Sequence, residues 1–244
     1  MDFCAKSDVG ITRIINEDNY GCYSGDNQNL FYFVVADGMG GHNAGEVASN
    51  LLVEYIIERA KESNKTFKTV EKIKHFIRNC IEKANKNIYS SSLADSLNRG
   101  MGTTAVMAII QGNDIVVGNV GDSRAYLLKK EIKKQITVDH SYIEELIKAG
   151  IIRREDAEIH PDRHVITRAL GMGSDINVDI FTDHFEQGDI LILCTDGLTS
   201  MIESSTLYEI VSAQLSAEEI CDLLIKTAND RGGYDNITVI VAKH

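Results

Sequence analysis

Apolar residues along this chain follow two patterns, short continuous runs and longer stripes at helical spacing. Continuous runs at 30–36 and 189–195 each end at an Asp-Gly or Thr-Asp-Gly step, and such runs predict buried strands. Stripes at three- and four-residue spacing predict helices over 43–60 and 69–89, each with one face packed inward.

The second half of the chain continues with closely spaced strands. Runs typical of strands occur at 104–110, 114–120, 124–128 and 134–138. Because parallel strands need crossovers of a dozen or more residues, their short connections predict antiparallel hairpins. Strands grouped in blocks, with the helices in separate blocks, indicate an α+β fold.

Three further elements complete the expected order. A helix over 139–149 begins at Asp139 or Ser141 as its N-cap. The capping box at 216–219 predicts another helix through 228. A final strand covers 237–242.

Composition narrows the class of protein. The 244 residues contain one proline and no Ser/Gly tract, so we expect a single domain over 1–244 without an internal linker. With 36 acidic against 25 basic residues the net charge is -11, which disfavours nucleic acid and anionic membranes as partners. We expect a monomer.

Cysteine usage and the N-terminal residues indicate the compartment. Five scattered cysteines without a Cys-x-x-Cys pair disfavour a disulfide framework or a thiolate zinc site and favour a reducing cytosol. The N-terminal residues have no apolar core of a signal peptide, and no apolar run approaches the length of a membrane span. We therefore expect a cytoplasmic protein.

Candidate chemistry lies in aspartates next to predicted strands. Asp37 and Asp196 follow apolar runs, Asp122 follows the strand at 114–120, and Asp235 precedes the last strand. In an antiparallel sheet the exit of one strand lies beside the entrance of its neighbour, so these carboxylates could meet at one edge. Such a cluster is self-repelling unless cations neutralise it, and its oxygen ligands suit Mg²⁺ or Mn²⁺. A single Asp-Gly step is more often a turn, so the prediction depends on the four together.

Seven short motifs follow one another along the chain, and together they cover nearly all of it. They are Arg13–Asp18, Ala36–His42, Gly102–Thr104, Asn119–Arg124, Thr167–Gly171, Thr195–Leu198 and Asp235–Thr238. In this order they resemble the motifs of a known family, the metal-dependent protein phosphatases of type 2C, and in particular their small bacterial single-domain members.

The resemblance implies a fold and an activity. The fold is a four-layer α-β-β-α sandwich of two mostly antiparallel sheets flanked by helices. The activity is hydrolysis of phosphoserine and phosphothreonine in proteins by activated water at a binuclear Mn/Mg centre, without a covalent enzyme intermediate. Phosphoproteins are the implied substrates, and a partner Ser/Thr protein kinase and its targets are expected among them.

The same resemblance assigns metal ligands. Asp37 would bridge both ions, with the Gly38 carbonyl completing one coordination shell. Asp196 and Asp235 match the remaining carboxylates, and Asp122 with Asp196 matches the ligands of a third, weaker ion.

Other residues are assigned roles around the metals. Glu17 and Asp18 would reach the ions only through water, and Arg13 would hold the substrate phosphate with its planar guanidinium. Many eukaryotic relatives have a histidine where this chain has Met39. Either His42 or a water would then protonate the leaving oxygen, and we favour a role for His42 in shaping the rim.

A polar segment at roughly 145–166 corresponds by resemblance to a flap beside the active site, although an ordinary connector would look the same. Two other functions stay open, a hydrolase of small phosphate esters and an inactive regulatory module. A cysteine phosphatase is excluded, because a Cys-x5-Arg loop beginning at Cys194 would need arginine where Ser200 stands.

Overall fold

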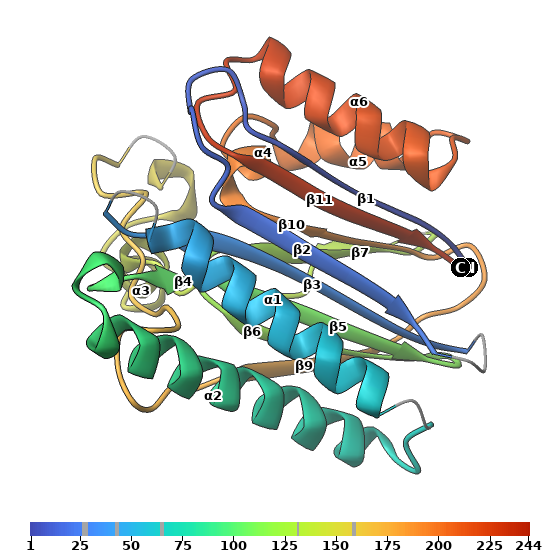
Figure 1. Ribbon diagram of the computed structural model, residues 1–244. Helices are drawn as coiled ribbons and strands as arrows, with labels where there is room; N and C mark the ends of the chain where they lie inside the picture. The colour runs from blue at the N-terminus through green and yellow to red at the C-terminus, as the bar shows by residue number, and fades with distance from the viewer. Residues whose placement is uncertain (26–28, 42–43, 64–65, 131, 158–159) are drawn as a thin grey trace.

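The chain folds into four layers, two sheets face to face with helices on both outer faces (Figure 1). This computed structural model describes residues 1–25, 29–41, 44–63, 66–130, 132–157 and 160–244. Helices α1 (Ala44–Glu62) and α2 (Val70–Ala94) cover one sheet, while α5 (Ser204–Ser212) and α6 (Ala217–Asp230) cover the other. The expected α-β-β-α sandwich is confirmed.

One sheet has the strand order β1-β11-β10-β7-β8, and its neighbouring strands are antiparallel. The bounds are β1 (Asp2–Asp8), β7 (Arg124–Leu128), β8 (Lys133–Gln135), β10 (Ile190–Cys194) and β11 (Ile237–Lys243). Since β1 pairs with β11, the two ends of the chain lie together.

The other sheet has the order β2-β3-β5-β6-β9, again antiparallel, and β4 pairs with the end of β3. The bounds are β2 (Asp18–Ser24), β3 (Leu30–Met39), β4 (Gly102–Thr103), β5 (Ala105–Gln111), β6 (Asp114–Val120) and β9 (Asp179–His184). The short helices are η1 (Ser96–Asn98), α3 (Tyr142–Lys148), η2 (Arg154–Asp156) and α4 (Asp196–Thr199).

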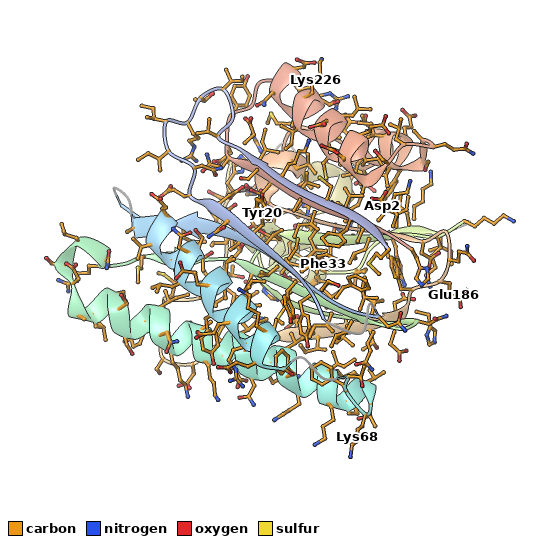
Figure 2. The ribbon with its side chains drawn as sticks, turned by 45° about the vertical axis from the view of Figure 1, so that its right-hand side comes forward. Asp2, Tyr20, Phe33, Lys68, Glu186 and Lys226 are labelled. Carbon is orange, nitrogen blue, oxygen red and sulfur yellow. The ribbon has the colours of Figure 1, made fainter. Side chains whose placement is uncertain are left out.

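The core has three parts, one between the sheets and one under each helical layer. Side chains fill the space between the sheets around Phe33, which is fully buried (Figure 2). Because β3 and β5 are buried on both faces, they carry continuous apolar runs, which is the pattern from which they were predicted.

The sequence-based elements are largely confirmed. Strands β6 and β7 have the predicted bounds. The N-cap of α3 is Ser141, whose Oγ accepts a hydrogen bond from the Glu144 N–H at 3.2 Å, and not Asp139. The capping box opens α6, with the Glu219 N–H 3.2 Å from Ser216 Oγ.

Some boundaries were wrong, and several elements were not predicted. Strand β3 does not stop before Asp37 but continues to Met39, because β2 and β4 supply pairing partners for its last residues. The strand expected over 134–138 is shorter, ending at Gln135. Strands β1, β2 and β9 lack a continuous apolar run and were missed, and so were the helices α4 and α5. No helix in the described part of the chain is both long and apolar enough to cross a membrane.

Candidate metal centre

Two of the candidate aspartates lie opposite each other on neighbouring strands. Asp18 opens β2 and pairs in register with Asp37 near the end of β3. The backbone of Asp37 is fixed from the other side, because its N–H donates to Thr104 Oγ1 at 3.0 Å and its carbonyl accepts from the Thr104 N–H at 2.9 Å. The sheet therefore holds both residues at one edge.

Asp122 reaches the same edge through the turn after β6. Gly121 adopts a φ of 105°, and a Cβ there would lie 2.6 Å from the Thr104 methyl carbon, so the turn requires glycine. The next residue, Ser123, places its Oγ 2.7 Å from Thr104 Oγ1. Thr104 thus ties the turn that carries Asp122 to the strand that carries Asp37.

Asp196 and Asp235 come together through a close approach of two backbones. Asp196 is the first residue of α4, and Asp235 stands just before β11. A Cβ on Gly197 would lie 2.0 Å from the Asn236 carbonyl oxygen and 3.3 Å from Asp235 Cβ. Glycine at 197 is what allows the two aspartates to be neighbours.

Asn236 is a residue to which the sequence analysis gave no role. It is buried, its Nδ2 donates to the carbonyl oxygens of Val9 and Ile15 at 3.0 and 2.9 Å, and its Oδ1 accepts from the Glu17 N–H at 2.9 Å. These bonds attach the loop carrying Arg13 and Glu17 to the strand next to Asp235. Its place in the motif that follows Asp235 was the available signal.

The carboxylates influence one another's pKa values. Burial raises the pKa of Asp37 well above its usual value, and the charges of Asp18, Asp196, Asp122 and Asp235 raise it further. Burial also raises the pKa of Asp18 and of Asp122 to about 7. Burial and the charge of Asp235 raise the pKa of Asp196 as well. The five side chains repel one another as ionised groups.

A few contacts hold this arrangement together. The contact with Asp37 partly offsets the rise in the pKa of Asp196. Arg13 Nη2 donates to Asp235 Oδ2 at 2.8 Å, and Thr195 Oγ1 donates to Asp18 Oδ2 at 2.8 Å. Among the described residues, no group of three or more His, Cys, Asp or Glu side chains is already arranged to hold a metal ion.

The donor set fits hard divalent cations. Glu17 Oε1 and Asp18 Oδ1 are buried and have no hydrogen-bond partner among the residues that the structure describes, and burial raises the pKa of Glu17. A Cβ on Gly38 would lie 2.2 Å from the Gly45 carbonyl oxygen, so the backbone beside Asp37 is packed without a side chain. Buried carboxylates left without a balancing charge are what a dication neutralises. His42, the candidate acid, lies outside the described residues.

A large cleft opens beside the carboxylates, with a volume of about 990 Å³. Asp122, Asp196 and Asp235 line it, and so do Arg163 and His164 of the segment expected to be a flap. The described part of that segment therefore borders the candidate site. Arg168, which follows the segment in the chain, donates to Asp179 Oδ1 at 2.9 Å.

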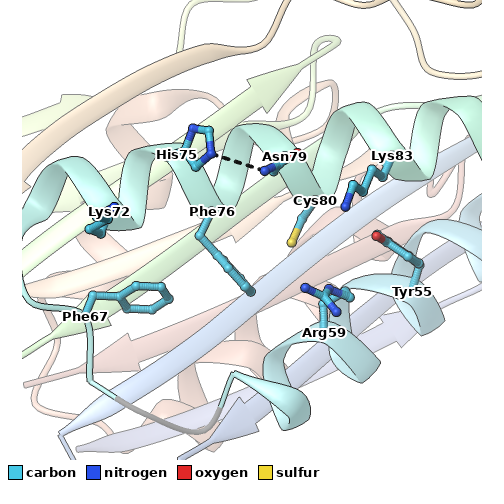
Figure 3. A pocket seen from close by; sticks show the side chains of 9 residues that line it. All are labelled: Tyr55, Arg59, Phe67, Lys72, His75, Phe76, Asn79, Cys80 and Lys83. Atoms are coloured by element: carbon cyan, nitrogen blue, oxygen red, sulfur yellow. Dashed lines mark hydrogen bonds between the residues drawn. The ribbon is translucent and has the colours of Figure 1, made fainter.

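A second cavity, of about 180 Å³, lies between α1 and α2 on the outer helical layer (Figure 3). The rings of Phe67 and Phe76 pack edge to face at 5.2 Å within it, and Arg59 and Lys83 stand near Cys80. Its described lining contains no carboxylate. The chemistry of the predicted site belongs to the larger cleft.

Comparison with known proteins shows which family this chain resembles. The family model of protein phosphatase 2C matches residues 10–145, and that of stage II sporulation protein E matches residues 147–244. The serine/threonine phosphatase stp of Listeria monocytogenes serovar 1/2a is 41% identical over 239 residues, covering 98% of this chain and 94% of the relative. The protein phosphatase PhpP of Streptococcus pneumoniae serotype 2 is 36% identical over 239 residues, covering 98% and 96%.

Solved structures agree. The serine/threonine phosphatase Stp1 from Staphylococcus aureus superposes with a TM-score of 0.92 at 32% identity, covering 100% of this chain and 95% of that one. The catalytic domain of the phosphatase PstP in complex with two manganese ions gives 0.85 at 32% identity, covering 99% and 96%. With family model, relatives and fold in agreement, the chain belongs to the protein phosphatase 2C family.

Proposed function

We propose that the chain hydrolyses phosphoserine and phosphothreonine in proteins with water activated at a centre of two divalent cations. The observation that carries this proposal is the meeting of Asp37, Asp122 and Asp196 at one sheet edge, none of them in an ion pair with a described basic side chain. Membership of the phosphatase family indicates the reaction, and the group of carboxylates indicates where in the molecule we expect it to occur.

Asp37 is the central carboxylate, because each of the other four acts on it. We propose that Asp37 and the Gly38 carbonyl would hold the ions together with the carboxylates of Asp196 and Asp235. When bound, such ions lower the pKa of water and neutralise the charge that develops in phosphoryl transfer. Asp122 with Asp196 would hold a third ion.

The buried oxygens of Glu17 and Asp18 would accept hydrogen bonds from ordered water and fix its orientation. Thr195 holds Asp18 in place, and Asn236 holds the backbone of Glu17. These two acids would therefore act on the ions through water.

Arg13 would bind the substrate phosphate. Its guanidinium already reaches the centre, where it pairs with Asp235, and both side chains are partly exposed, at 48% and 37%. Once cations balance the charge of Asp235, the planar fork of Arg13 can serve two phosphate oxygens. The leaving oxygen would take its proton from a water in the cleft or from His42, since Met39 has none to give.

Divalent cations are the cofactors, and Mn²⁺ and Mg²⁺ both suit the oxygen donors. Phosphoproteins are the substrates, with a Ser/Thr protein kinase and its targets proposed among them. We propose further that the chain acts in the cytoplasm as a monomer and as one catalytic domain over 1–244, with the flap at roughly 145–166 bordering the cleft.

The test is hydrolysis of a phosphothreonine peptide and of para-nitrophenyl phosphate with Mn²⁺ or Mg²⁺, before and after chelation with EDTA. We expect turnover of both substrates, its loss on chelation, and a loss of about a thousandfold or more in Asp37→Asn. The matched control is Asp230→Asn, an exposed aspartate on α6, which should keep full activity.

The two alternatives give different results. A hydrolase of small esters would turn over para-nitrophenyl phosphate with a higher kcat/KM than the peptide under matched conditions. An inactive regulatory module would bind no Mn²⁺ in calorimetric titration and would hydrolyse neither substrate.

A further inference from the structure

An exposed apolar surface adjoins the proposed phosphate site. Ile14 is 96% exposed, Ile11 69% and Tyr234 64%, and all three lie within two positions of Arg13 or Asp235 in the chain. Large apolar side chains that cluster in water without a packing role mark interaction sites more often than chance exposure does. We call Ile11, Ile14 and Tyr234 the apolar rim.

The rim is built on two loops that the fold binds together. The N–H groups of Ile11 and Thr12 donate to the Gly233 carbonyl oxygen at 2.8 and 3.2 Å. The side chain of Ile11 lies against Gly233, where an added Cβ would come within 2.8 Å of it. With Asn236 bonded to Ile15 and Arg13 paired with Asp235, the loops before β2 and β11 form one unit.

We propose that the apolar rim is a docking surface for the residues that flank the phosphorylated side chain of a protein substrate. The proposal rests on the proposed function, because a phosphate held by Arg13 fixes where the rest of the substrate lies. Because the rim residues lie within two positions of Arg13 or Asp235, the substrate residues closest to the phosphoresidue are the ones that we expect to contact the rim.

The occupant that fits this position is a phosphorylated peptide with apolar flanks. The cleft that Asp235 lines carries charges of both signs, and its arginines Arg163 and Arg231 suit the phosphate of a substrate. Tyr234 lines the cleft as well and so joins its polar part to the rim. The surface therefore suits phosphorylated segments whose flanking residues are large and apolar.

The experiment compares two phosphothreonine peptides of equal length and charge, with leucine or serine on both sides of the phosphoresidue. We expect the wild-type kcat/KM to be about tenfold higher for the leucine peptide, through KM, because burying a side chain of this size is worth that factor. Ile14→Ser and Tyr234→Ser should each reduce the ratio to about threefold or less. Ile132→Ser, a 54% exposed residue between β7 and β8, is the matched control and should keep the ratio.

Para-nitrophenyl phosphate separates docking from catalysis, since it has no flanking residues. The docking surface is overturned if the wild-type ratio is near one, if neither rim variant changes it, or if the rim variants lose small-ester turnover in the same proportion. A dimer in analytical ultracentrifugation that Ile14→Ser dissociates, with the peptide ratio unchanged, would assign the surface to a second copy instead and equally overturn it.

Binding to Asp37→Asn, measured by fluorescence anisotropy of the two peptides, keeps the proposals distinguishable. Absence of all turnover in the wild type with tighter binding of the leucine peptide contradicts the proposed function and supports the docking surface. Turnover of both peptides with equal binding supports the function and contradicts the docking surface.

Discussion

Two groups of carboxylates in this protein differ in how their charge is balanced. Asp139 accepts a forked set of hydrogen bonds from Arg124, with Nε at 2.9 and 3.1 Å and Nη2 at 2.7 Å. Asp183 lies 2.8 Å from Lys129 Nζ and 2.5 Å from Lys134 Nζ. At the sheet edge, by contrast, Asp37 and Asp196 have no ion pair with a described basic side chain, and burial and neighbouring acids raise the pKa of both.

The contrast separates structural from functional charge. Where the fold supplies its own cation, the pair orders the protein and needs nothing else. Where it gathers five acids and supplies one arginine, Arg13, it gives up stability in the free protein, and we propose that a metal completes the site. Asp122 lies between the two groups of carboxylates. Burial is the main cause of its raised pKa, and the charges of Asp196 and Asp139, one from each group, raise it further.

The strongest test of the comparison removes the cation from a balanced pair. Arg124→Leu leaves Asp139 half-buried without its guanidinium and close to Asp122. We expect the free energy of unfolding of the metal-free protein to fall by about 2–3 kcal/mol, measured by urea denaturation.

Arg153→Leu is the control for that experiment, because Arg153 also pairs with an aspartate, Asp156, but is 77% exposed. Its effect should stay within about 0.5 kcal/mol. Equal effects of the two substitutions would show that the Arg124 pair has no special structural weight.

The next test removes an acid from the unbalanced group. Asp37→Asn takes away one of the repelling charges, so the metal-free protein should become more stable at neutral pH by about 1 kcal/mol. Mn²⁺ stabilises the wild type by mass action and should no longer raise the Tm of the variant in a thermal melt. Asp139→Asn, at a balanced position, should instead lower the stability. A loss of stability in Asp37→Asn, equal to that of Asp139→Asn, would contradict the distinction.

The fold was predictable where strands lie inside the sheets and not where they lie at the edges. Interior strands β3, β5, β6, β7, β10 and β11 were all expected. The edge strands are β1, β2, β8 and β9, of which three were missed and β8 was misplaced. An edge strand pairs on one side only and is partly exposed, as the half-buried β9 is, so its sequence lacks the continuous apolar run.

The residues around the candidate site also differ in whether the sequence could predict their contacts. Asp37 and Asp196 were recognisable because each follows a buried run in the sequence. Neither the pairing of Arg13 with Asp235 nor the anchoring role of Asn236 could be predicted, because both join residues that lie more than two hundred positions apart. Such contacts follow from the antiparallel pairing of β1 with β11, and an edge strand gives little local sign of its partner.

The smallest expected effect concerns the acid dependence of a balanced pair. Burial alone would raise the pKa of Asp183, but hydrogen bonds from Lys129 and Lys134 outweigh it and lower the pKa to about 2. A carboxyl whose pKa is lower in the folded than in the unfolded chain stabilises the fold above its unfolded pKa of about 3.9, and the contribution is lost as the pH falls toward 2. Asp183→Asn should therefore lower the free energy of unfolding by less than about 1 kcal/mol at pH 7, with a smaller difference from wild type at pH 3. Urea denaturation at both pH values measures it, with the exposed Asp230→Asn as the control. A difference that stays constant with pH would mean that Asp183 acts through packing and not through its charge, and the balanced group would then lose one of its two members.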